Sequence, residues 1–323
     1  MFTKRAILAG FASAFALAAL PAAQAADDFP AEPIRLIVPY SPGGGTDVTA
    51  RIVAEAVSEN IGQPVVVENR PGASGTVGTL LAAREKADGY TLLFGIQATM
   101  ALNPSLFKAA TYKPKEDFDG VALISESPYV ITVPGASDIN TYEEFAKAAT
   151  DRMTMANGGS AALLASRLLA RDADLKFSNI PYSGSGAAIS DILAGRVDAL
   201  ISSPVSVLPH IESGALKPIL ATSADRYHAL PQTPTADELG FEGFKVVGWY
   251  SIVAPKGVPQ DRLEKLNAAF NKAVADPKTS QRLSEIGVTP SGLALGQQAV
   301  TDYIAKEYDL WTAEIADAGL EAK

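Results

Sequence analysis

Runs of residues patterned as β-strands alternate with runs patterned as α-helices along most of this chain. Ile34–Tyr40 is a mostly apolar run, as expected of a buried strand, and 48–61 carries its apolar residues on one helical face. Val65–Glu68 is a second strand, and the pattern repeats up to a third strand at Tyr90–Phe94. Strands joined through helices pair in parallel with right-handed crossovers, so the sequence predicts an α/β fold.

The alternation restarts near residue 128, which predicts a second α/β unit. The strand Tyr129–Val133 opens this unit, and strands and helices then alternate up to Thr222. A late strand at Trp249–Ala254 precedes a mostly helical tail, and we expect it to return to the first unit. The predicted domains are 26–127 together with 249–323, and 128–248. We expect a ligand cleft between them.

The first 25 residues have the pattern of a signal peptide that directs export. Lys4 and Arg5 precede an apolar run, Ala6–Leu20, and Ala23-Gln24-Ala25 has the small-x-small pattern that signal peptidase recognises. The apolar run is about 15 residues long, whereas a membrane-spanning helix needs roughly 20. We therefore predict cleavage after Ala25, and removing 25 of the 323 residues leaves a mature chain of 298.

The composition argues against several classes of site. The chain has no cysteine, which excludes disulfides, thiolate metal ligands and a lipid-modified cysteine anchor. Its formal net charge of −9 argues against nucleic acid as a partner, because nucleic acid is bound through clustered lysine and arginine. The two histidines, His210 and His228, lack the spacing of metal ligands, and no glycine-rich loop matches a nucleotide-binding motif. We therefore expect no metal and no cofactor.

Four polar, glycine-rich loops follow predicted strands, at 42–47, 72–75, 157–160 and 183–186. In open α/β sheets, ligands bind where such loops meet the N-termini of the following helices. Glycine lets the backbone approach a ligand closely, and a helix N-terminus offers unpaired N–H groups and partial positive charge. Each loop alone is better explained as an ordinary strand-to-helix turn. Their recurrence in both predicted domains favours a clamp for a small carboxylate.

The strongest indication of an enzyme is the sequence Gly-Gly-Ser-Ala-Ala around Ser160. It resembles the nucleophile elbow of hydrolases, with alanine replacing the last glycine. Asp191 or Asp198, followed by His210 or His228, would complete the chain order of a Ser-Asp-His triad. No separate oxyanion loop is evident in the sequence. We therefore interpret Ser160 as a helix N-cap or a ligand contact, and hydrolysis as the weaker alternative.

These loops belong to longer stretches that together resemble a known family. The two most specific are Pro-Tyr-Ser-Pro-Gly-Gly-Gly-Thr-Asp at 39–47 and Val-Glu-Asn-Arg-Pro-Gly-Ala at 67–73. Further matching stretches lie in family order at 88–93, 103–107, 181–184, 208–211 and 254–259. In this combination the sequence resembles the substrate-binding proteins of tripartite tricarboxylate transporters, also called the Bug family.

The resemblance implies a type II, Venus-flytrap fold. Its two α/β domains are each a mostly parallel sheet flanked by helices, and we expect the chain to cross between them near 125–129 and 246–251. It also implies a monomeric periplasmic solute-binding protein, not an enzyme. Such a protein captures a small carboxylate, a di- or tricarboxylate or an aromatic acid, by hinge closure and delivers it to the membrane subunits of a transporter. A sensor that feeds a signalling receptor would use the same cleft and stays an alternative.

In such proteins the ligand carboxylate lies between the loop here formed by Tyr40–Asp47 and a facing loop here formed by Asn157–Ser160. One departure concerns Leu163, which stands where many members have histidine, so a more apolar or aromatic acid is conceivable. The full set of predicted ligand-binding residues is Tyr40, Ser41, Gly43, Gly44, Thr46, Asp47, Ser74, Gln97, Thr99, Asn157, Gly159, Ser160, Ser183 and Ser203.

Overall fold

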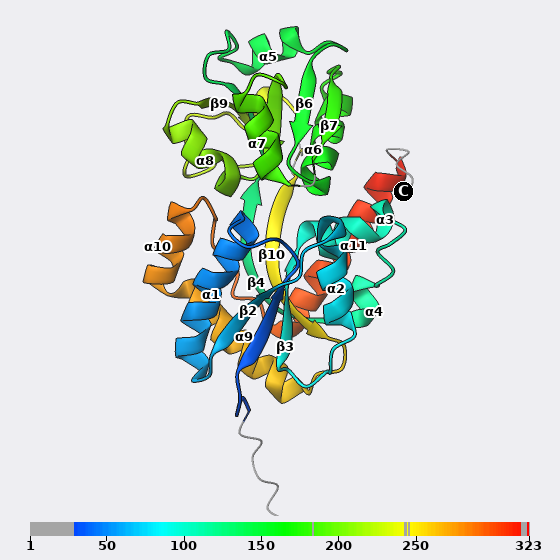
Figure 1. The fold of residues 1–323 in the computed structure, drawn as a ribbon, viewed down its shortest axis with the longest axis vertical. Helices are drawn as coiled ribbons and strands as arrows, with labels where there is room; N and C mark the ends of the chain where they lie inside the picture. The colour runs from blue at the N-terminus through cyan, green and yellow to red at the C-terminus, as the bar shows by residue number, and fades with distance from the viewer. Residues whose placement is uncertain (1–28, 183, 242–243, 245, 318–321, 323) are drawn as a thin grey trace, which may run out of the picture.

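The computed structural model describes residues 29–317 and 322, apart from 183, 242–243 and 245 (Figure 1). The predicted signal peptide, 1–25, and the predicted ligand contact Ser183 lie outside the described residues. The described part forms two bodies, one above the other in Figure 1, each built on a five-stranded sheet. Among the described residues, no helix combines the length and the hydropathy that a membrane span requires.

Five strands form the sheet of the first body: β1 (Ile34–Val38), β2 (Val65–Asn69), β3 (Thr91–Ile96), β4 (Phe118–Pro128) and β10 (Val247–Pro255). Their order across the sheet is β2-β1-β3-β10-β4. β1 pairs in parallel with β2 and β3, whereas β10 runs antiparallel to β3 and β4. Four of these five strands therefore point the same way, and β10 is reversed.

The sheet of the second body repeats this arrangement. Its strands are β5 (Val130–Pro134), β6 (Thr154–Asn157), β7 (Ser178–Pro181), β8 (Ala199–Ser202) and β9 (Leu216–Ala221), in the order β7-β6-β8-β5-β9. β6 pairs in parallel with β7 and β8, and β5 runs antiparallel to β8 and β9. The fourth strand in this order, β5, is again the reversed one. The predicted α/β architecture of two mostly parallel sheets is confirmed.

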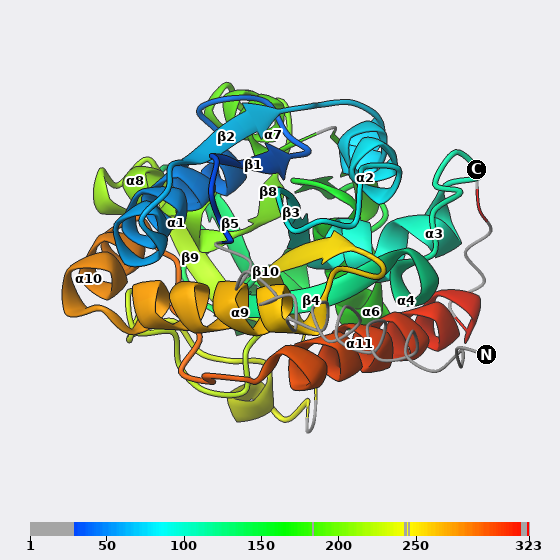
Figure 2. The same cartoon turned by 90° about the horizontal axis from the view of Figure 1, so that it is seen from below.

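Helices cover both faces of the first sheet because successive strand residues point to opposite sides. Ile34, Leu36 and Val38 of β1 pack into one core, and Ile37 packs into another. The first core is closed by α1 (Gly45–Ile61), α9 (Gln260–Ala275) and α10 (Pro277–Glu285), and the second by α2 (Thr76–Ala83) and α11 (Gln297–Asp317). In Figure 2, α1 and α10 lie on one side of the strands and α2 on the other.

The second sheet is covered in the same way. Met155 and Ile201 pack against α5 (Tyr142–Ala148) and α6 (Ser160–Asp172), whereas Ala156 and Leu200 pack against α7 (Ser185–Leu193) and α8 (Pro204–Glu212). Short helices complete the described chain: η1 (Ala73–Gly75), the π-helix η2 (Ala98–Leu102), α3 (Asn103–Leu106), α4 (Pro114–Asp117) and η3 (Asp237–Leu239).

The chain passes between the two sheets at two places. β4 ends at Pro128 and β5 begins at Val130, so Tyr129 alone separates a strand of one sheet from a strand of the other. The return runs from the end of β9 at Ala221 to the start of β10 at Val247. The two reversed strands, β5 and β10, are those that directly follow these crossings. The exact domain boundaries, 127/128 and 248/249, stay predictions.

Candidate functional site

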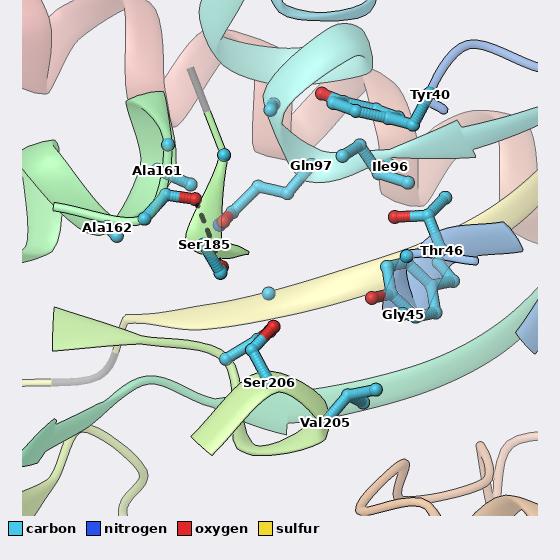
Figure 3. Close-up of a pocket in the computed structure, with 18 of the residues that line it drawn as sticks. Tyr40, Gly45, Thr46, Ile96, Gln97, Ala161, Ala162, Ser185, Val205 and Ser206 are labelled. Atoms are coloured by element: carbon cyan, nitrogen blue, oxygen red, sulfur yellow. Dashed lines mark hydrogen bonds between the residues drawn. The ribbon is translucent and has the colours of Figure 1, made fainter. Parts of the chain in front are cut away.

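A cavity of about 550 Å³ lies where loops of the two bodies face each other (Figure 3). Both sheets contribute loops that follow their parallel strands, as expected for ligand sites in open α/β sheets. Strand β10, which carries the chain back from the second body, supplies one wall. The described lining residues are 40–46, 74, 96–98, 125, 127–129, 158–162, 184–187, 203, 205–206 and 248–250.

Four helices begin at this cavity without a side-chain cap. Their N-cap residues are Gly44 for α1, Gly159 for α6, Gly184 for α7 and Ser203 for α8, and none of these makes a side-chain capping bond. By contrast, Thr141 caps α5, which begins away from the cavity, with a capping box. Uncapped first turns leave backbone N–H groups free and carry partial positive charge. The cavity therefore offers hydrogen-bond donors to an anion from both bodies.

The described lining residues include no Asp, Glu, Lys, Arg or His. An anion in this cavity would therefore be held by backbone N–H groups and by hydroxyl and amide side chains, not by an ion pair. Such donors avoid the desolvation cost of burying a charged side chain together with its ligand. The side-chain donors along the lining are Tyr40, Ser41, Thr46, Ser74, Gln97, Ser125, Ser127, Tyr129, Ser160, Ser185, Ser203, Ser206 and Tyr250. The indole N–H of Trp249 is instead donated to Glu307 (2.9 Å).

Asp47 organises the first cavity loop from behind. One carboxylate oxygen accepts hydrogen bonds from the Gly43 N–H (2.8 Å) and from Arg51 Nε (3.0 Å). The other oxygen accepts from Asn69 Nδ2 (2.8 Å), which also donates to the carbonyl of Tyr40. Burial favours the neutral carboxyl, but the bonds from Arg51, Gly43 and Asn69 outweigh it and lower the pKa of Asp47. The carboxylate thus stays charged while it braces the loop.

The tyrosines of the cavity are neutral donors. Burial raises the pKa of Tyr40, Tyr129 and Tyr250 above the ordinary value, because loss of water disfavours the charged phenolate, although each residue keeps part of its surface exposed along the cavity. The Tyr40 hydroxyl donates to the Ser74 carbonyl (3.0 Å), and the Tyr129 hydroxyl donates to Gln97 Oε1 (3.4 Å). Gln97 is 2% exposed, and its Nε2 has no hydrogen-bond partner among the described residues. That N–H₂ group is available to a ligand oxygen.

Most of the predicted ligand-binding residues come together at this cavity. Those in the lining are Tyr40, Ser41, Gly43, Gly44, Thr46, Ser74, Gln97, Gly159, Ser160 and Ser203. Asp47, Thr99 and Asn157 lie behind the lining. Thr99 Oγ1 bonds to the backbone of Ile96 within its own turn. Asn157 is fully buried at the end of β6, and its amide has no partner among the described residues.

Sequence reasoning missed several residues that line the cavity, among them Ser185, Val205, Trp249 and Tyr250. Ser185 falls in the predicted loop 183–186 and directly follows Gly184. Its position at the start of a helix could therefore have marked it as a residue that lines the cavity. Trp249 and Tyr250 lie in a predicted strand. The alternating pattern of residues in a strand cannot show whether that strand borders a cleft. Val205 gives no local signal, because only the approach of the two bodies brings it to the cavity.

The structure does not assemble the alternative triad around Ser160. The Ser160 hydroxyl donates to Asn103 Oδ1 (3.2 Å), and no hydrogen bond joins it to a histidine in the described chain. Asp191 is engaged by Tyr182 and Arg196, and Asp198 accepts from Thr154. Ser160 is instead the first residue of α6, with its hydroxyl bonded across to the first body.

Sequence comparisons find relatives along nearly the whole chain. A family model, the tripartite tricarboxylate transporter family receptor, matches residues 49–320. A UPF0065 protein from the tcbD-tcbE intergenic region of Pseudomonas sp. (strain P51) is 36% identical, over 99% of this chain and 96% of its own. Protein BugT of Bordetella pertussis is 35% identical, over 95% of this chain and 96% of its own.

Solved structures share both the fold and part of the sequence. The periplasmic binding protein BugD is 32% identical with a TM-score of 0.82, over 91% of this chain and 100% of its own. An R. palustris protein solved with adipate is 28% identical with a TM-score of 0.84, over 92% and 100%. MatC from Rhodopseudomonas palustris with bound malate is 30% identical with a TM-score of 0.80, over 89% and 100%.

Proposed function

The chain belongs to the tripartite tricarboxylate transporter receptor family, a family of periplasmic binding proteins, and from this premise we propose that it captures a small carboxylate between its two bodies. Capture is by hinge closure, and the loaded protein delivers the acid to the membrane subunits of a tripartite tricarboxylate-type transporter. We further propose that the leader is removed after Ala25 in the periplasm and that the chain acts as a monomer.

One observation carries this proposal. Helices from both bodies begin at one cavity with uncapped first turns, and the described wall of that cavity has no charged side chain. An anion there would bridge the bodies and stabilise the form in which they are close together, which is how a ligand drives closure. Similar proteins were solved with adipate and with malate, so small dicarboxylates are the first class to test.

The test is thermal unfolding of the mature chain, refolded to remove any bound acid, against a panel of di- and tricarboxylates, aromatic acids and uncharged amides of the same acids. A ligand at a thousand times its Kd adds about 4 kcal/mol to the free energy of unfolding. At about 2 °C per kcal/mol for a chain of this size, we expect the midpoint to rise by several degrees.

A rise with one class of acid and none with its amide would support anion capture and identify the substrate class. If every acid and its amide shift the midpoint equally, the cavity does not select the carboxylate. If no acid changes the midpoint of a folded sample, the proposal fails.

A further inference from the structure

The start of α8 in the second body packs directly onto a glycine of the first body. Gly45 is the first residue of α1, and Val205 lies in the first turn of α8. A Cβ atom on Gly45 would lie 2.7 Å from Cγ1 and 3.2 Å from Cβ of Val205. Two carbon atoms need about 3.5–4.0 Å. A side chain at position 45 is therefore incompatible with this approach of the two bodies.

The local backbone does not require glycine at position 45. Gly45 is helical and is not among the glycines with positive φ, unlike the nearby Gly43 at φ 80°. Within a helix, alanine is favoured over glycine. Local preference would therefore select alanine here, and the constraint against it comes from Val205 across the cavity.

A second glycine of the first body, Gly287, packs against the same part of α8. Gly287 follows α10, and a Cβ atom there would lie 3.2 Å from the Val205 nitrogen and 3.4 Å from Leu208 Cδ2. In Figure 1, α8 lies above the first-body helices α1 and α10. Gly45 and Val205 also both line the cavity, and Figure 3 places them away from Ala161 and Ala162 of α6. The contact is thus at one end of the cavity that would hold the ligand.

We propose that Gly45 and Val205 form the contact that sets how far the two bodies close over the cavity. The inference rests on the proposed function, since closure matters only if the cavity captures a ligand. With a methyl group at position 45, the two bodies come into contact before they are fully closed over the cavity. The helix N-termini of the second body then stop short of a ligand that is bound at α1, and the ligand cannot be held from both sides.

The experiment measures the distance between the bodies. The chain has no cysteine, so Glu59→Cys on α1 and Glu212→Cys on α8, both at exposed positions, accept spin labels at these two sites alone. Distances are recorded by pulsed electron paramagnetic resonance for the chain alone and with adipate or malate. We expect Gly45→Ala to lower the ratio of closed to open forms by about fivefold to a hundredfold, the range that overpacking produces.

Two further variants make the interpretation specific. Val205→Ala in the Gly45→Ala chain removes the 2.7 Å contact with Cγ1 and leaves only the 3.2 Å contact with Cβ, which a shift of a few tenths of an ångström relieves, so the double variant should recover most of the closed form. Gly296→Ala is the matched control, because this first-body glycine lies outside the cavity lining and a Cβ there would meet nothing within 4 Å, and it should leave the distances unchanged. A change in helix stability alone would not be reversed by Val205→Ala.

Different experimental results would contradict the Gly45–Val205 proposal and the proposed function. If the parent chain shows two distances and Gly45→Ala leaves their ratio unchanged, or if Val205→Ala does not restore it, the Gly45–Val205 proposal is wrong and capture by closure stands. If the parent shows one distance alone, with and without each acid, closure itself is absent and both proposals are overturned. A Gly296→Ala chain that opens as far as Gly45→Ala would also overturn the steric account.

Discussion

At the scale of single residues, Asp47 braces the first cavity loop through bonds within the protein. Its two oxygens accept bonds from Gly43, Arg51 and Asn69, and its side chain is 3% exposed. The bond to the Gly43 N–H fixes the loop at the point where it turns toward α1. The role of Asp47 is therefore to shape the loop whose backbone faces the cavity.

We expect Asp47→Asn to lower the free energy of unfolding by about 1–3 kcal/mol, because a buried charged acceptor and an ion pair are lost. The pKa of Asp47 is lower in the folded chain than in the unfolded one, whose value is about 3.9. Its contribution to stability is therefore complete above that value and is lost as the pH falls through the folded pKa.

Urea unfolding at pH 7 and pH 3 should show that the difference in unfolding free energy between parent and Asp47→Asn is smaller at the lower pH. The exposed Glu212→Gln is the control, and a difference that grows on acidification would contradict this assignment.

At the scale of elements, the four helices that begin at the cavity lack a side-chain cap, as α9 at Pro259 also does, whereas α5 and α10 have one. α5 has its capping box and α10 has Asp276 at its N-cap, and both begin away from the cavity. α7 begins with Gly184, whose extended backbone (φ 174°, ψ 167°) any residue can adopt and whose Cβ would meet nothing within 4 Å. Neither backbone geometry nor local packing therefore explains the absence of a capping side chain at α7.

Gly184→Asp should stabilise the chain and weaken ligand binding together. A capping carboxylate would satisfy the first-turn N–H groups and add about 0.5–1 kcal/mol to the free energy of unfolding. The same charge near the ligand carboxylate should lower affinity at least about tenfold. Both are measured with the acid that gives the largest thermal shift, by calorimetry and by unfolding without ligand. Gly184→Asn caps without charge and should lose less affinity. Unchanged affinity in Gly184→Asp would place the ligand away from α7.

At the scale of the whole molecule, the two bodies share an arrangement that brings their helix N-termini together. Each sheet has four strands in one direction and one reversed strand, and each reversed strand follows a crossing of the chain. The cavity is the space between the two sets of loops, and its described wall contains no charged side chain. Under the proposed function, selection of an anion would therefore be distributed over helices that lie far apart in the sequence.

This distribution predicts that affinity depends little on pH. The titratable side chains in the described wall are tyrosines, and the pKa values of Tyr40, Tyr129 and Tyr250 are raised by burial. Between pH 6 and 9 these groups keep their charge and a dicarboxylate such as malate stays almost fully ionised, so the Kd for such an acid should stay constant within about twofold. Isothermal titration across this range tests it. A step near pH 6.5 would instead show that a histidine takes part in binding.

The amino-acid sequence by itself determined the architecture and the loops of this protein. The periods of strand and helix, the glycines after the strands and the restart near residue 128 are local features, and each follows from backbone sterics and amphipathic burial. Four glycine-rich loops are predicted at a ligand site on this basis, and the resemblance to the family singles out 40–47 and 157–160; residues of both line the cavity. The predicted cleavage after Ala25 rests on the same kind of local pattern.

The tertiary structure alone decided which side chains of those loops face the cavity. Asp47 turns back to brace its own loop, because Gly43, Arg51 and Asn69 satisfy its carboxylate. Thr99 closes its own turn through the backbone of Ile96. Trp249 and Val205 reach the cavity only because segments distant in the chain pack beside it. The 2.7 Å approach at Gly45 likewise belongs to the meeting of two bodies. Strand and helix periods and helix caps are encoded in short stretches of sequence. Distances between segments far apart in the chain are set only when all the elements have packed together.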